Sequence, residues 1–425
     1  MPPVIFQLLR RGLDPSVPTG EFAGQWKNPS DVFSVLLILG GDVVARALAQ
    51  VAGTHVTPVA FSFGKSPCAP SPYIMLTFVF CPSGWVAYAV TAVVSAVGEN
   101  KLMPPPDCAC QVINGRTGYV RENSSWIIGR IVRDFESWMD NGQSGAPIRN
   151  CLNEMLDQQW ENDKQKAERK RPGSGKNVPR RTRAGLCVSI YKAKPARPGY
   201  PGYDFVYFIG FVTVAVQLGI ATIPCAVYGD WGILLISVSG IILSVATGSI
   251  SQWSKEKWAC RVHSEKTVIL SRGNGTQHAI VIIGAGNGFD LEDLAAGPTN
   301  LGVNSSYTTR IAVILLAIFW ILLLITAAGL RQNTWFLLAI GGIGILQNIF
   351  VAGWRRFPEA FGVPLEFEAV IGKPKVMDTL FAVEEAYPCM GRSMRDTFFP
   401  GKLRIDEVKK WDDLENITST RNLPC

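Results

Sequence analysis

Four long apolar segments constrain the fold of this chain more than any other feature of its sequence. Each is about as long as the roughly 20 residues that an α-helix needs to cross about 30 Å of hydrocarbon. The 425 residues are 48% hydrophobic and only 18% charged, which is richer in apolar residues than a typical soluble protein. The sequence therefore predicts membrane spans at Phe205 to Tyr228, Trp231 to Ile250, Ile311 to Leu330 and Trp335 to Gly353.

Two further segments bring the predicted number of transmembrane helices to about six. Residues 31–53, "DVFSVLLILGGDVVARALAQVAG", form an apolar run that carries Asp42 and Arg46. The other apolar segment is interrupted by residues 65–84, and removing them joins its flanks into one spanning helix from Val59 to Gly98. We therefore predict an all-α polytopic fold with spans in residues 31–98, 205–250 and 310–353.

The interruption at residues 65–84, "KSPCAPSPYIMLTFVFCPSG", looks like a translated intron. The codons for Gly64, Lys65 and Ser66 can contain the splice donor GTAAGT, and those for Ser83 and Gly84 can contain an acceptor AG. Both cuts fall in the same phase, so splicing would leave the reading frame intact. The alternative is a real loop with an apolar stretch, and the sequence of the mature transcript distinguishes the two interpretations.

Lysine and arginine residues next to the spans predict the orientation of the chain. Basic residues gather in the connection at residues 99–204, in the connection at residues 251–309, and in the tail at residues 354–425. Six spans place these regions and the N-terminal segment, residues 1–30, on one side. The positive-inside rule predicts that this side is the cytosol, in a multi-pass protein of the endomembrane system or plasma membrane.

The first large connection contains an amphipathic stretch followed by a basic one. Residues Ile127, Ile131, Phe135 and Trp138 recur at helical spacing and predict an amphipathic helix. Residues 164–197 hold twelve lysines and arginines but a single acid, and the region is rich in proline and glycine, which predicts an extended linker. A solvated linker and a surface for anionic lipid headgroups both fit this composition, whereas no nucleic-acid-binding module accompanies it. The predicted lipid-contacting residues are Lys164, Lys166, Arg169, Lys170, Arg171, Arg180, Arg181 and Arg183.

The second connection predicts a β-hairpin and a glycine-rich turn. Residues 267–270 and 279–283 read as strands on either side of "RGNGTQ". The following "GAGNGF" lacks the last glycine of a dinucleotide-binding GxGxxG motif, so we predict no cofactor. We expect instead a turn into a short helix that Asp290 caps.

Four stretches, "WKNPSDVFSVLLILGGDVV", "SQWSKEKW", "VIIGAGNGFDLEDLA" and "YPCMGRSMRDTFFPG", resemble uncharacterised polytopic integral membrane proteins of filamentous fungi. The resemblance covers most of the chain. It implies a membrane location and a multi-pass fold, but it supplies no catalytic residues.

Chemistry-bearing motifs are sparse in this sequence. The three histidines have no second histidine or cysteine at metal-ligand spacing, so we predict no metal site, and no catalytic motif is found. The best candidate site is the intramembrane pair Asp42 and Arg46, four residues apart on one helix face, which could be functional or structural. We predict a membrane scaffold or interaction protein that binds membrane lipids and protein partners. The alternatives are a membrane-embedded enzyme acting on a lipophilic substrate and a small transporter.

Overall fold

A computed structural model describes residues 40–53, 58, 60–61, 84–99, 101–171, 175, 178–299, 301–330 and 332–420. The chain divides into two compact units. The membrane unit combines Met1–Leu102, Tyr203–Trp253 and Ser305–Trp354, and the sheet unit combines Met103–Gly202, Ser254–Asn304 and Arg355–Cys425. Each unit is thus assembled from three separate stretches of sequence.

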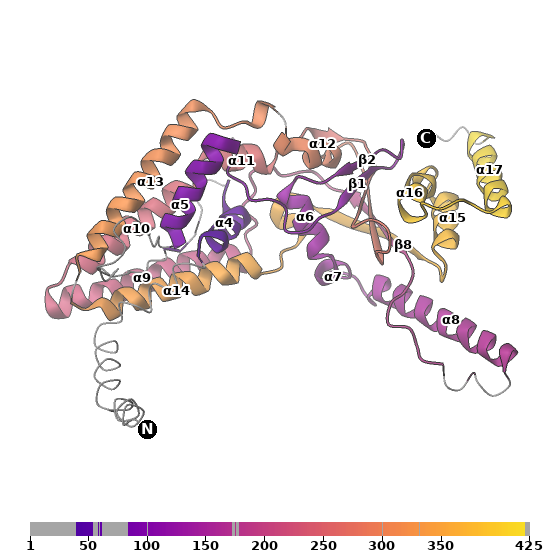
Figure 1. The fold of residues 1–425 in the computed structure, drawn as a ribbon, viewed down its shortest axis with the longest axis horizontal. Helices are drawn as coiled ribbons and strands as arrows, with labels where there is room; N and C mark the ends of the chain where they lie inside the picture. Colours follow the sequence, from indigo (N-terminus) through magenta and orange to yellow (C-terminus); the bar gives the residue numbers. More distant parts are fainter. Residues whose placement is uncertain are drawn as a thin grey trace, which may run out of the picture. The chain divides into compact units, whose positions relative to one another are not determined.

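Helices of the membrane unit form a closed ring of contacts, in which each packs chiefly against two neighbours and α10 also contacts α14. Figure 1 shows these helices grouped together. The order around the ring is α4, α5, α13, α10, α9, α14 and back to α4. Helix α5 continues into a π-helical turn, η1, and the short helix α11 follows α10. The bounds are α4 Gly40–Val51, α5 Gly84–Val94, η1 Ser95–Glu99, α9 Phe205–Tyr228, α10 Gly232–Gly248, α11 Ser251–Lys257, α13 Tyr307–Ala328 and α14 Thr334–Gly353.

Four helices of the described residues are long and apolar enough to cross a membrane, as the sequence predicts. These candidate spans are Phe205–Tyr228, Gly232–Lys257, Tyr307–Ala327 and Thr334–Gly353. Much of their surface is exposed in the isolated chain, including Phe208, Ile242 and Leu322. Exposed apolar side chains of this kind are the surface that lipid tails would cover.

The two remaining predicted spans are described only in part. Helix α4 and the apolar helix Trp85–Glu99 are shorter than the four candidate spans. The predicted intron, residues 65–84, lies outside the described residues except for Gly84. Its two flanks meet in space, because Trp85 Nε1 donates a hydrogen bond of 3.2 Å to the carbonyl oxygen of Ala60. Ala60 and Phe61 are not helical in this chain, which carries residues 65–84, whereas the spanning helix from Val59 to Gly98 was predicted for a chain without them.

Non-helical backbone at Ala60 and Phe61 lies at the centre of the ring. The Phe61 ring stacks on Trp320 of α13 with centroids 6.0 Å apart, and a Cβ atom at Gly240 of α10 would overlap it. A Cβ atom at Gly344 of α14 would overlap the Phe61 carbonyl oxygen. The two glycines therefore provide the space that this backbone occupies.

A six-stranded mixed sheet forms the middle of the sheet unit. The strand order is β2-β1-β5-β6-β3-β8, and only β3 and β6 run parallel. The bounds are β1 Gln111–Asn114, β2 Val120–Glu122, β3 Cys187–Ala193, β5 Val268–Ser271, β6 His278–Ile283 and β8 Leu365–Gly372. A separate pair joins β4, Val262–Ser264, to β7, Gly288–Phe289. The predicted hairpin is confirmed in β5 and β6, but the all-α fold class is wrong for this unit.

One face of the sheet carries the hydrophobic core under three C-terminal helices. Val188 and Ile190 of β3 alternate onto this face, where they join Leu380 and Met394 in one buried cluster. The helices are α15 Val376–Ala386, α16 Met390–Phe398 and α17 Ile405–Thr420, which Figure 1 shows together in yellow. The remaining helical elements are α6 Trp126–Arg133, α7 Phe135–Trp138, α8 Pro147–Lys170, α12 Leu291–Ala296, η3 Gly297–Thr299, η4 Leu301–Val303 and η5 Pro358–Phe361.

The helix predicted in the first connection is confirmed, whereas the basic linker that follows it differs from its prediction. The amphipathic stretch is helical, as α6 and α7, and its four apolar residues are buried inside the sheet unit, where they cannot insert into lipid. The predicted basic linker contains the end of α8 and the interior strand β3. Apolar Val188 and Ile190 alternate along this strand, so its period-2 pattern was masked by the basic residues around it.

Strand pairing places three distant segments on one side of any membrane that the four helices cross. Strands β1 and β3 precede α9, β5 and β6 lie between α10 and α13, and β8 follows α14. Strand β1 is hydrogen bonded to β5, and β3 to β6 and β8. Two candidate spans separate each segment from the next, so two crossings return the chain to the side from which it left. The strand pairing requires the same arrangement, with all three segments on one side.

Candidate functional site

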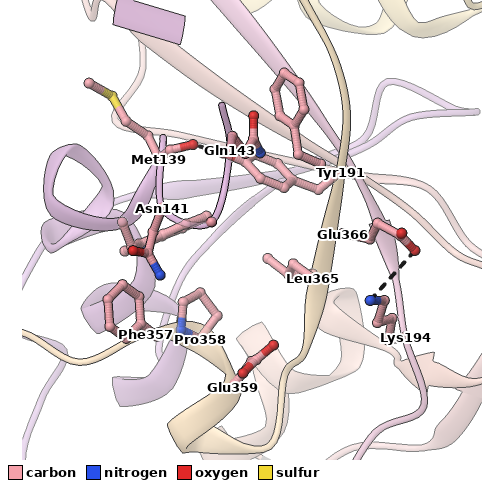
Figure 2. Close-up of a pocket in the computed structure, with 13 residues that line it drawn as sticks. Met139, Asn141, Gln143, Tyr191, Lys194, Phe357, Pro358, Glu359, Leu365 and Glu366 are labelled. Carbon is pink, nitrogen blue, oxygen red and sulfur yellow. Dashed lines mark hydrogen bonds and ion pairs between the residues drawn. The ribbon is translucent and has the colours of Figure 1, made fainter. Parts of the chain in front are cut away.

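A groove of about 510 Å³ in the sheet unit is the candidate binding site (Figure 2). The α7–α8 connection supplies Met139 to Gln143, and β3 with the residue after it supplies Tyr191 and Lys194. Phe357 to Glu359 come from the start of η5, and Leu365 to Phe367 from the start of β8. The groove therefore forms only when the first connection and the tail fold together.

Aromatic side chains make the floor of the groove. The rings of Trp138 and Tyr191 lie 5.3 Å apart, and those of Tyr191 and Phe367 lie 5.7 Å apart. Tyr191 Oη donates a hydrogen bond of 3.0 Å to the carbonyl oxygen of Met139. Burial raises the pKa of the Tyr191 phenol, with smaller contributions from Asp140 and Cys187, so the phenol stays protonated. These contacts fix the floor before a ligand arrives.

The rim of the groove is polar and carries more acidic than basic groups. Lys194 Nζ lies 3.7 Å from Glu366 Oε2, and Figure 2 shows this ion pair opposite Asn141 and Phe357. Glu359 is exposed on the rim, and Phe357 is 46% exposed although it is aromatic. The lining residues include no histidine, cysteine or serine. An aromatic floor with a polar rim is the arrangement typical of a protein-binding surface.

Asp42 and Arg46 lie one turn apart on α4, and both side chains are exposed in the isolated chain. Their role, functional or structural, stays a prediction.

Three side-chain amides, from Gln217, Gln347 and Asn348, come together inside the membrane unit. Gln217 Nε2 of α9 donates to the carbonyl oxygens of Phe61 at 2.6 Å and Ile340 at 2.9 Å. Gln347 Oε1 accepts from the Ala60 amide at 3.3 Å, and Asn348 Nδ2 donates to the Ala60 carbonyl oxygen at 3.3 Å. These bonds satisfy non-helical backbone that lipid could not hydrate.

Several of the predicted lipid-contacting residues are paired with acids. Arg180 Nη2 lies 2.7 Å from Asp157, and Arg181 Nε lies 2.7 Å from Asp163. Lys164 lies 3.2 Å from the centroid of the Trp160 ring. Lys166, Arg169, Lys170 and Arg171 are exposed at the end of α8, and Arg183 is exposed before β3. The acids that pair with these arginines, Asp157 and Asp163, precede residue 164. The charge count of residues 164–197 therefore did not include them.

The glycine-rich turn has the structure predicted for a helix cap. Asp290 Oδ1 accepts a hydrogen bond of 3.1 Å from the Asp293 amide at the start of α12. Lys266 Nζ lies 3.0 Å from Asp290 and 3.2 Å from Glu292. The prediction that Asp290 caps this helix is confirmed.

Groove residues were largely missed by sequence reasoning. Trp138 was identified only as part of an amphipathic stripe, and Phe357 only as part of the basic start of the tail. Alternation in "CVSIY" is the signal that could have placed Tyr191 on a strand. Comparisons with protein-family models, curated proteins and solved structures gave no match.

Proposed function

We propose that this protein is a membrane-anchored interaction protein whose sheet unit binds a polypeptide segment of a partner. The observation that carries the proposal is the groove, in which a buried aromatic floor adjoins an exposed Phe357 and an acidic rim. Aromatic anchors in such pockets supply much of the binding energy at protein interfaces. The excess of acid over base favours a partner segment with an apolar side chain next to a lysine or arginine.

Orientation is part of the same proposal. Both termini and the sheet unit lie in the cytosol, in a multi-pass protein of the endomembrane system or plasma membrane. The basic residues that flank the predicted spans support this orientation. Strand pairing is consistent with it, because it requires both large connections and the tail to share one side.

Selection from a random peptide display library on the full chain in lipid nanodiscs tests the groove. We expect enriched peptides to share an aromatic or aliphatic residue beside a lysine or arginine. The double substitution Phe357→Ala with Glu359→Lys should weaken their binding by about tenfold or more, because it removes an aromatic anchor and reverses a rim charge.

A matched control makes the same two kinds of change outside the groove. Tyr119 is 57% exposed, and Glu122 lies on strand β2. The double substitution Tyr119→Ala with Glu122→Lys should leave peptide binding unchanged. No enrichment, or equal losses in the two double variants, would overturn the proposal.

Transport is a second candidate, and one specific observation favours it. Three buried atoms of the amide cluster, Gln217 Oε1, Gln347 Nε2 and Asn348 Oδ1, have no hydrogen-bond partner among the described residues. Non-helical backbone beside polar side chains is typical of binding sites in transporters. Transport ranks second because the bonds that these amides do make stabilise the fold itself.

A further inference from the structure

A second pocket in the sheet unit, of about 320 Å³, is lined by residues that the proposed function does not use. The segment 132–136, at the end of α6 and the start of α7, forms one wall. The β5–β6 hairpin, from Leu270 to Ile280, forms another, and Arg183 comes from the stretch before β3. Three separate segments thus bring their polar side chains to one place.

Two arginines of this pocket are held in position by backbone carbonyl groups. Arg183 Nη2 donates a hydrogen bond of 3.1 Å to the Gly275 oxygen, and Arg272 Nη2 donates one of 3.4 Å to the Val132 oxygen. Among the residues that the structure describes, neither guanidinium lies within ion-pair distance of a carboxylate. Each is therefore oriented by one bond and keeps further N–H groups for a ligand.

The other charged groups of the pocket differ from these two arginines. Arg133 is held between Asp107 and Asp134, with N–O distances of 3.0 Å and 2.8 Å, so its charge is already balanced. Glu136 also lines the pocket and is exposed. The pocket therefore holds an excess of positive charge at Arg183 and Arg272.

His278 adds an uncharged polar group at the pocket. Its Nδ1 atom is buried and has no hydrogen-bond partner among the described residues. Its ring lies 5.1 Å from that of Phe135, in an edge-to-face contact. Thr276 Oγ1, on the same hairpin, already donates a hydrogen bond of 2.8 Å to the Gly273 carbonyl oxygen. A ligand that accepts several hydrogen bonds would satisfy the remaining N–H groups of the two guanidiniums and, in the tautomer protonated at Nδ1, the His278 imidazole.

We propose that this pocket binds a phosphate monoester through Arg183 and Arg272. A guanidinium presents a planar fork of donors that matches phosphate oxygens and binds them in pairs. The volume lies at the lower end of the range for small-molecule sites, so it accepts a phosphate with a small organic group. The phosphate can belong to a lipid headgroup or to a soluble metabolite, since the contacting chemistry is the same.

Isothermal titration of the full chain in phosphatidylcholine nanodiscs tests the pocket with two probes. One arm uses inorganic phosphate, and the other uses a water-soluble short-chain phosphatidylinositol 4-phosphate. Saturable binding of at least one probe is expected. Comparable affinities indicate a soluble source, and tighter binding of the lipid indicates a headgroup. The double substitution Arg183→Gln with Arg272→Gln should weaken binding by about tenfold or more, because two charge-assisted contacts are lost.

A matched control changes the net charge equally within the same basic stretch. Arg180→Gln with Arg181→Gln removes two arginines that face Asp157 and Asp163 rather than the pocket, and it should leave the affinity unchanged. Arg183→Lys with Arg272→Lys keeps the charge but loses the forked donors, so we expect intermediate affinity. Equal losses in the two glutamine variants, or no binding of either probe to the unmodified chain, would overturn the proposal.

Discussion

Replacing Arg130 with methionine is expected to destabilise the sheet unit by about 3–5 kcal/mol, the cost of breaking a buried ion pair by removing one partner. The Arg130 side chain is fully buried, with Nη1 2.6 Å from Asp107 and Nε 3.1 Å from Asp134. Burial lowers the pKa of the Arg130 guanidinium, while Asp134 acts against this shift. Without Arg130, two carboxylates that are almost fully buried lose their buried cationic partner, although Arg133 still lies 3.0 Å from Asp107 and 2.8 Å from Asp134.

Urea unfolding of the full chain in detergent, followed by tryptophan fluorescence, measures this effect. Arg149→Met is the control, because Arg149 is 63% exposed and lies 4.0 Å from Asp140, a geometry worth at most about 1 kcal/mol. Adding Asp107→Asn and Asp134→Asn to Arg130→Met should recover much of the lost stability, since the buried charges are then gone. A midpoint for Arg130→Met equal to that of the unmodified chain would show that the ion pairs are not required.

Gly344→Ala is expected to prevent the membrane unit from folding around its central backbone. The new Cβ atom would overlap the Phe61 carbonyl oxygen and lie 2.9 Å from Gln217 Nε2. Neither group can move away easily, because the two are hydrogen bonded to each other. Overpacking of a core typically costs about 1–3 kcal/mol, and more where backbone must shift.

Size-exclusion chromatography of a fluorescent fusion reports the amount of folded protein. Gly342→Ala is a matched control on the same helix, because a Cβ atom there meets nothing within 4 Å. This control should accumulate like the unmodified chain, and the higher helix propensity of alanine favours it slightly. Equal yields of monodisperse protein from the two variants would mean that Gly344 does not face the central backbone.

Long-range pairing separates what the sequence could predict from what it could not. The four candidate spans follow from length and hydropathy, and the β5–β6 hairpin follows from two alternating runs around a turn. Strand β3 pairs with β8, whose residues lie more than 170 positions away and beyond the four candidate spans. No local pattern encodes such a partner. The groove and the phosphate pocket depend on these pairings. The sequence therefore shows their individual residues but not that these residues assemble into a site.

The same reasoning explains why polar residues near one another in space were judged separately. Gln217 and Gln347 are polar positions in apolar helices, and no local pattern shows that they bind the same backbone segment. That backbone lies at Ala60 and Phe61, in a stretch that hydropathy had assigned to a helix. A glycine in each facing helix, Gly240 and Gly344, is compatible with close packing in general. The presence of these two glycines does not show which segment of the chain packs against them.

Protease accessibility in sealed microsomes tests most directly whether the two large connections and the tail form one domain on one side of the membrane. A site-specific cleavage sequence would be inserted singly between Ser144 and Gly145, between Asn274 and Gly275, or between Gly401 and Lys402, all of which are exposed. These positions sample the three segments of the sheet unit. We predict that the protease cuts all three variants without detergent. A mixed pattern, with one site cut and another resistant until detergent is added, would contradict the shared sheet and the topology that it requires.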